Sequence, residues 1–208
     1  MCGQAGPKTG ECAILEIHHK IPSPDEMDRH DERNLITLCQ GCHSWHHKRP
    51  TRADVPVDIS TADAANLLPH DFEIISVLHS NGPLTTSEVT ERISPQMTTV
   101  GVRERLWRLM GLDNIVDRRD TQLIDQNAET GEWGMPEDIV NSARGRVPDD
   151  TQTLAQRIED QQVRNAAERG YDHDEVAELF GCHQRTVYCK VSRARAYDLS
   201  IKSLKGTK

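Results

Sequence analysis

The sequence has few aromatic side chains and no long apolar run. Phe, Tyr and Trp make up 4% of the 208 residues, and only 36% of the residues are hydrophobic. So little bulky apolar material favours several small modules over one large core. No segment reaches the roughly 18 consecutive apolar residues that span a bilayer, and no basic segment followed by an apolar one opens the chain. These absences predict a soluble, cytoplasmic protein with no membrane association.

The six cysteines are also few. Without an export signal, a C-x-x-C pair is more often a metal clip or a redox site than a disulfide. Cys182 and Cys189 lie in an Arg-rich helical segment and are predicted to be small buried apolar residues. The other four cysteines are candidate metal ligands: Cys2, Cys12, Cys39 and Cys42.

The net charge of −8 is unusual for a protein that binds nucleic acid, but it is unevenly distributed. Residues 1–52 carry 7 basic and 7 acidic side chains, residues 53–150 carry 8 and 18, and residues 151–208 carry 10 and 8. The acidic excess therefore lies in the middle of the chain, and the C-terminal part is mildly basic. This acidic, Lys-poor composition resembles that of proteins from salt-loving archaea or their viruses.

Changes in composition predict a multidomain protein that is mainly α-helical with small α+β parts. The small, acidic, Pro-containing stretch 53–66 and the Gly- and Pro-containing stretch 143–150 are predicted linkers. The remaining segments are a module at 1–52, a module at 67–142, a module at 151–202 and a tail at 203–208.

The central module has the order of a winged helix-turn-helix, with three helical patterns followed by an alternating, turn-rich stretch that predicts a β-hairpin. PLTTSEVTERI and TTVGVRERLWRLMGLDNIVD resemble winged-helix modules of archaeal proteins. Arg103 is the candidate DNA contact. A protein–protein module is the alternative, because the middle of the chain is acidic. In the third helix, the residues predicted to face inward are Val102, Leu106 and Leu109, and those predicted to face outward are Thr99, Arg103, Arg105 and Arg108.

In the C-terminal module, the last two of three predicted helices have helix-turn-helix spacing. Ala177 is the small residue at the helix crossing, Gly181 forms the turn, and Val187 is the apolar anchor. The module resembles the helix-turn-helix of resolvases and sigma factors. The alternative is a solvated charged helix. The side chains predicted to face solvent and contact DNA are Gln184, Arg185, Tyr188, Arg193 and Arg195.

Six of the ten histidines lie in the first 52 residues, and five of these are in ECAILEIHHKIP and NLITLCQGCHSWHHK. The first motif predicts a strand, on which His18 and His19 point to opposite faces and have different roles. The second predicts a strand and a helix, on which His43 and His47 share a face while Cys42 turns away. Two centres follow: an imidazole site for a divalent ion, and a thiolate site for structural zinc.

Together, LEIHHKIP, ERNLITLC and CQGCHSWHH resemble the HNH nuclease family over residues 1–50. The resemblance implies a β-hairpin packed on a helix around one divalent ion, the ββα-metal fold. It implies that His18 and His43 bind this ion, that His47 is a second ligand on the helix, and that His19 is the general base. It also implies that Asn34 orients the loop bearing His19 or approaches the ion.

The chain departs from the family at the structural zinc, which is usually bound by two C-x-x-C pairs. Only Cys39 and Cys42 form an intact pair, because Ala5 takes the second position of the pair that begins at Cys2. Three alternatives stay open: Cys12 supplies the missing ligand, His46 supplies it, or the site is incomplete.

These residue types suit metal-assisted hydrolysis of DNA. A neutral histidine accepts a proton near neutral pH, and a cation (Mg, Mn, Ni or Zn) stabilises charge on the leaving oxygen. The predicted function is a site-selecting endonuclease of the homing or viral type that acts on double-stranded DNA, with a homodimer as one route to a double-strand cut. The main alternative is a transcription regulator with an inactive HNH-derived zinc domain. A simple zinc clip at 39–47 would leave His18, His19 and Asn34 unexplained.

Overall fold

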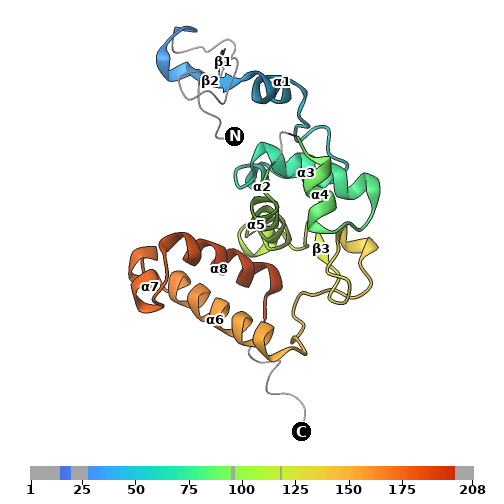
Figure 1. Cartoon of the computed structure of the whole chain (residues 1–208), viewed down its shortest axis with the longest axis vertical. Helices are drawn as coiled ribbons and strands as arrows, with labels where there is room; N and C mark the ends of the chain where they lie inside the picture. Colours follow the sequence, from blue (N-terminus) through green and yellow to red (C-terminus); the bar gives the residue numbers. More distant parts are fainter. Residues whose placement is uncertain (1–14, 20–27, 95–96, 118, 200–208) are drawn as a thin grey trace.

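A small N-terminal unit lies at one end of a larger helical body in the computed structural model (Figure 1). Strands β1 (Leu15–His19) and β2 (Leu35–Cys39) pair antiparallel, with His18 opposite Ile36. The short helix η2 (Glu32–Asn34) precedes β2, and helix α1 (Gln40–Lys48) follows it directly. The unit therefore has the strand–strand–helix order expected from the sequence. The structure describes residues 15–19, 28–94, 97–117 and 119–199.

Helix α1 is attached to the body through Trp45. The Trp45 side chain is buried, its ring stacks on His70 with centroids 4.2 Å apart, and its indole N–H donates to a carboxylate oxygen of Glu73 at 2.9 Å. His70 and Glu73 both belong to helix α3 (Pro69–Asn81). The N-terminal unit is thus joined to the body by packing and by a polar contact as well as by the chain.

The body is built around a core to which distant parts of the chain contribute. Val102, Leu106 and Leu109 are all fully buried, which confirms their predicted inward orientation. None of the helices in the described part of the chain has the length and apolar character that a membrane span requires. The elements that follow α1 up to residue 138 are α2 (Thr61–Ala64), α3, α4 (Thr86–Arg92), α5 (Thr99–Met110), η3 (Leu112–Asn114), β3 (Asp125–Gln126), β4 (Trp133–Gly134) and η4 (Pro136–Asp138).

Residues 53–66 differ from the linker expected from their composition. Val55 and Ile59 are buried in the central core, and Asp63 in α2 pairs with Arg119 at 2.8 Å. Isolated apolar residues in an irregular segment have no period, so their burial could not be predicted from a sequence pattern. The segment is a packed part of the body.

Three helices form the C-terminal part: α6 (Thr151–Glu168), α7 (His173–Leu179) and α8 (Gln184–Tyr197). Helix α8 contacts both α6 and α5, and Ala196 and Tyr197 at its end belong to the central core. The second expected linker is also packed, since Arg144 pairs with Asp113 at 2.8 Å and the Gly145 N–H donates to the Tyr197 carbonyl at 2.7 Å. The C-terminal helices are therefore packed against the central body and do not form a separate domain.

The turn between α7 and α8 has the local geometry predicted from its spacing. Gly181 adopts φ +60°, a conformation that suits glycine because it has no Cβ. Ala177 is 7% exposed and Val187 is fully buried, so both pack where the two helices meet. That this unit binds DNA stays a prediction.

Candidate metal and catalytic site

Three histidines from the strand and the helix meet in the N-terminal unit. His18 lies on β1 and His43 and His47 lie one turn apart on α1, and one ligand atom from each falls within 4.8 Å of the other two. The Nε2 atoms of His43 and His47 are 3.2 Å apart. Two imidazole nitrogens that bind one ion at about 2.0–2.1 Å lie roughly 3 Å from each other, so this cluster fits a divalent metal ion.

Glu16 supports this cluster from the same face of β1, two residues before His18. Its carboxylate pairs with Nδ1 of His43. A carboxylate on one ring nitrogen fixes the tautomer, so the lone pair of the other nitrogen is available to a metal. For His43 that second nitrogen is Nε2, which faces His47. Glu16 was not predicted, although strand alternation places it beside His18.

The electrostatics of the cluster favour neutral imidazoles. Burial lowers the pKa of His18, and the neighbouring His47 and His43 lower it further. Burial also lowers the pKa of His46, followed by the positive charge of Arg49. Because a metal binds the neutral ring, these shifts keep ligand nitrogens available at lower pH.

His46 belongs to the imidazole side of α1. Its ring centroid is 4.2 Å from that of His18. Cys42, one turn earlier on α1, is buried, so the alternative in which His46 joins the thiolates stays a prediction. The ring of His46 therefore packs beside the proposed ion ligands.

His19 points to the opposite face of β1 and lies beside His30. His19 Nε2 and His30 Nδ1 are 3.4 Å apart. The His30 backbone N–H donates to Asp28 Oδ1 at 2.9 Å, and the nearly fully buried Asn34 donates from Nδ2 to the Arg29 carbonyl at 2.9 Å. Asn34 thus fastens the loop that faces His19. His30 was missed because its position depends on the return of this loop, for which spacing gives no signal.

The thiolate pair lies at the start of α1. Cys39 is the N-cap residue, and its sulfur accepts a hydrogen bond from the Cys42 backbone N–H at 3.4 Å. This contact satisfies one of the N–H groups that a helix start leaves unpaired. Cys2, Ala5 and Cys12 lie outside the described residues, so the structural zinc stays a prediction.

The predicted DNA contacts on α8 divide into two groups. Arg185 and Tyr188 are exposed and Gln184 is partly exposed. Arg193 instead makes a two-pronged contact with the fully buried Asp160, at 2.5 and 2.8 Å, and Arg195 lies 3.6 Å from Glu168. The predicted solvent-facing orientation is therefore wrong for Arg193 and Arg195, because α6 covers that face of α8.

The arginines of α5 divide in the same way. Arg103 is exposed, as predicted. Arg105 instead pairs with the fully buried Asp71, and Arg108 donates from Nε to the Asn66 carbonyl at 3.2 Å. Both side chains are therefore only partly exposed, and the prediction that they are free in solvent is wrong, because each binds an oxygen near α3.

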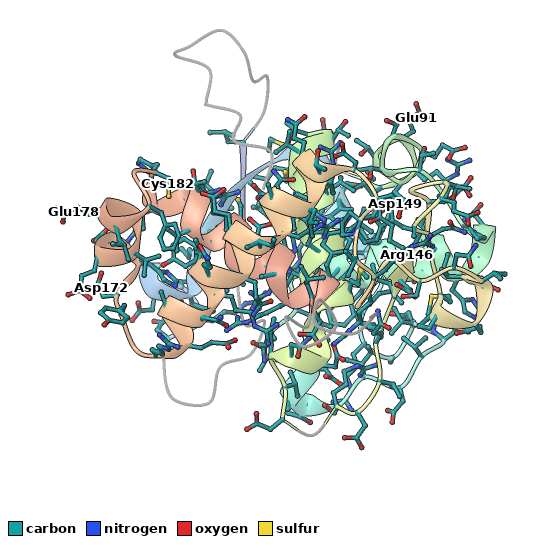
Figure 2. All side chains as sticks on the ribbon, turned by 90° about the horizontal axis from the view of Figure 1, so that it is seen from below. Glu91, Arg146, Asp149, Asp172, Glu178 and Cys182 are labelled. Atoms are coloured by element: carbon teal, nitrogen blue, oxygen red, sulfur yellow. The ribbon has the colours of Figure 1, made fainter. Side chains whose placement is uncertain are left out.

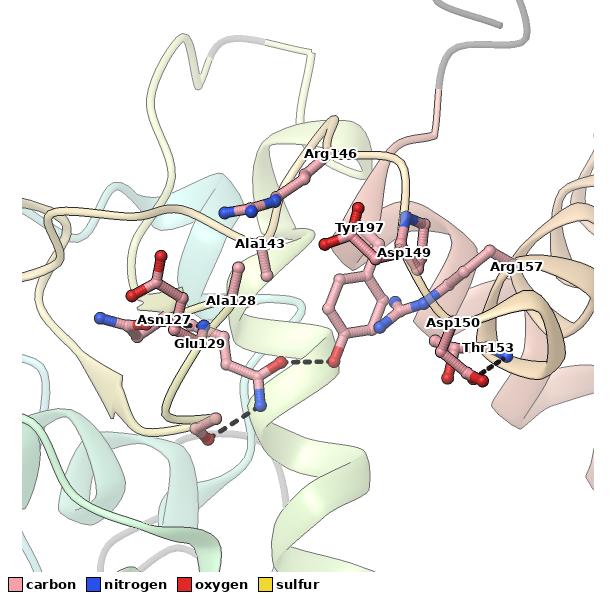
Figure 3. A pocket seen from close by; sticks show the side chains of 13 residues that line it. Asn127, Ala128, Glu129, Ala143, Arg146, Asp149, Asp150, Thr153, Arg157 and Tyr197 are labelled. Carbon is pink, nitrogen blue, oxygen red and sulfur yellow. Dashed lines mark hydrogen bonds between the residues drawn. The ribbon is translucent and has the colours of Figure 1, made fainter.

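A cavity of about 600 Å³ lies between the β3–β4 hairpin and the start of α6 (Figure 3). The Arg157 guanidinium stacks on the Tyr197 ring, and burial lowers the pKa of Arg157 to about 10. The Tyr197 hydroxyl donates to Gln126 at 2.5 Å and accepts from the Trp107 indole at 3.2 Å. These contacts tie the hairpin to α5 and α8, so this wall of the cavity has a bracing role.

No curated protein and no solved structure matches the chain. A family model does match its N-terminal unit, and the matched range contains both strands of the hairpin and the three clustered histidines. Over residues 1–49 the chain is similar to the HNH endonuclease family.

Proposed function

We propose that the chain is a metal-dependent endonuclease that hydrolyses phosphodiester bonds in double-stranded DNA. The observation that carries the proposal is the meeting of His18, His43 and His47, with ligand atoms within 4.8 Å of one another. The match of residues 1–49 to HNH endonucleases supports the same activity.

The three imidazoles would hold a divalent ion such as Mg²⁺, Mn²⁺, Ni²⁺ or Zn²⁺. Bound there, the ion would polarise a phosphoryl oxygen and stabilise charge on the leaving oxygen. Three protein ligands are the number that catalytic sites use when a position must stay open for water or substrate. Glu16 would hold His43 in the tautomer that binds through Nε2.

His19 is the proposed general base. A neutral imidazole can accept a proton from water, which is the task of a general base. His19 follows a proposed ligand directly but faces the other side of β1, so it stays outside the ligand set. His30, on the loop that Asn34 fastens, would restrict rotation of the His19 ring.

The activity is tested by incubating supercoiled plasmid with the protein and each of the four ions. We expect nicking by the wild type and a loss of about 10²–10⁴-fold in His19→Ala, the range for removal of a general base. His79→Ala is the matched control, because His79 is exposed near the end of α3. Equal nicking by the wild type and His19→Ala would refute the role of His19 as general base.

A transcription regulator with an inactive nuclease domain is the second candidate. The α7–turn–α8 unit, with Gly181 at φ +60°, favours it. Such a protein would bind DNA and slow its migration in a gel, with an affinity that falls steeply as salt rises, but it would not nick the DNA. The nuclease is instead expected to cut a defined site selected by the helical body, as homing-type and viral endonucleases do, and a homodimer would present one centre to each strand.

A further inference from the structure

Helices α5 and α8 lie side by side and are locked together (Figure 1). The Asn114 side chain donates to the Arg195 carbonyl at 2.9 Å. Gly111 fits closely against α8, since a Cβ at this position would lie 2.7 Å from the Ala196 nitrogen. The two helices expected to read DNA separately therefore form one unit with one shared surface.

A groove of about 310 Å³ opens between these helices. Helix α5 contributes Glu104, Arg105 and Arg108 to its lining, and α8 contributes Arg185, Tyr188, Cys189 and Ser192. The Arg185 side chain is 68% exposed and Tyr188 is 50% exposed. Guanidinium groups from both helices, the carboxylate of Glu104 and the hydroxyl groups of Tyr188 and Ser192 thus line a single open groove.

Helices α5 and α8 are rich in basic side chains, although the whole chain has a net charge of −8. Together they carry seven basic side chains and one acidic one, Glu104. Three of the seven, Lys190, Arg193 and Arg195, pair with acidic residues of α6 and are not among the residues that line the groove. Arg105 is paired with Asp71 and Arg185 with Glu104, but Arg108 binds neutral oxygens of Asn66. The groove therefore keeps positive charge. An exposed pair such as Arg185 with Glu104 is weak enough to exchange for another anion.

Arg185 and Tyr188, on the first two turns of α8, are exposed and border the groove, whereas the later turns are packed between α5 and α6. A recognition helix in the major groove contacts bases through its N-terminal residues. Acidic α7 bounds this surface on one side, and Figure 2 shows Asp172 and Glu178 at that end of the molecule. His173 packs edge-on against Tyr188 with ring centroids 4.2 Å apart, which holds the phenol at the rim.

We infer that the α5–α8 groove is a composite surface that binds the phosphate backbone of duplex DNA beside the exposed start of α8. Arg108 and Arg185 attract the phosphates, and Tyr188 and Ser192 donate hydrogen bonds to them, the side-chain types that commonly contact phosphate. Glu104 competes with phosphate for Arg185. This inference rests on the proposed action on DNA and assigns the surface that positions the duplex.

The test measures the fluorescence anisotropy of a labelled DNA duplex in EDTA over a range of NaCl concentrations, with the full chain. Arg185→Ala and Tyr188→Ala should each weaken binding, by roughly tenfold for the arginine. Arg185→Ala should also reduce the slope of log affinity against log salt by roughly 0.9, the value for one lost phosphate contact. Glu104→Gln should strengthen binding, because it releases Arg185.

Arg169→Ala is the matched control, since it removes an exposed arginine at the end of α6. Binding by Arg185→Ala and Tyr188→Ala equal to that of this control would overturn the inference. Preference for an acidic polypeptide over the duplex would overturn it in favour of a protein partner. Because EDTA removes metal ions, binding is measured independently of cleavage. If the protein binds DNA but does not nick it with added metal, the groove proposal stands and the nuclease proposal fails. If the protein nicks DNA normally but Arg185→Ala and Tyr188→Ala bind as the control does, only the groove proposal fails.

Discussion

Replacing Glu16 tests whether the carboxylate prepares His43 to bind a metal ion. Glu16→Ala removes both the charge and the acceptor at Nδ1 of His43, whereas Glu16→Gln keeps a neutral oxygen that can still accept. Loss of such a partner of a metal-binding histidine weakens metal affinity by about 10–100-fold. We expect metal affinity to fall by about 100-fold in Glu16→Ala and by about tenfold in Glu16→Gln. A tenfold loss corresponds to about 1.4 kcal/mol.

Isothermal titration calorimetry with Zn²⁺ or Mn²⁺ at constant pH measures this difference directly. Glu32→Gln provides the control, because Glu32 is an exposed carboxylate on η2 and its replacement changes the charge equally. Thermal melting of the metal-free variants shows whether the domain stays folded. Wild-type affinity in Glu16→Ala would refute the reasoning that this carboxylate orients His43.

Three further predictions concern the rest of the chain. Arg193→Ala should destabilise the fold by about 3–5 kcal/mol in denaturant melts, because it leaves the buried carboxylate of Asp160 without its main partner; unchanged stability with weakened DNA binding would restore Arg193 as a DNA contact. Since the pKa of His18 is lowered from 6.5 on folding, the unfolded chain takes up protons first, and the Tm of the metal-free protein should fall as pH drops below 6.5; a Tm that rises with acidification would contradict this. Burial, with a hydrogen bond to Glu104, raises the pKa of Cys189 to about 11, so its alkylation at pH 8 should be more than about tenfold slower than that of free cysteine, and an equal rate would contradict this.

The local periods of the sequence predicted much of the candidate metal site. A spacing of four on a helix placed His43 and His47 together, and strand alternation separated His18 from His19. Both relations depend only on residues close in sequence, so a correct element was enough to predict them. The same alternation places Glu16 beside the candidate ligand His18, so this carboxylate was predictable from the strand pattern as well.

Contacts between distant residues could not be predicted in this way. Arg193 and Asp160 are 33 residues apart, and Arg105 and Asp71 are 34 apart. A basic residue in a polar helical pattern gives the same local signal whether it faces water or a buried carboxylate on another helix. The charged faces of α5 and α8 were therefore predicted to be solvated where packing had paired them.

The helix that carries His43 and His47 is also fixed to α3 through Trp45, which affects where the proposed nuclease would cut. A nuclease domain on a flexible linker can reach many phosphodiester bonds on either side of its binding site, so its products have a mixture of ends. A docked helix instead fixes the distance between the proposed DNA-binding groove and the cleaved bond, since packed side chains hold the two parts in place. For the proposed nuclease, we therefore expect breaks at one fixed distance from the bound sequence, and Trp45→Ala should make that distance variable.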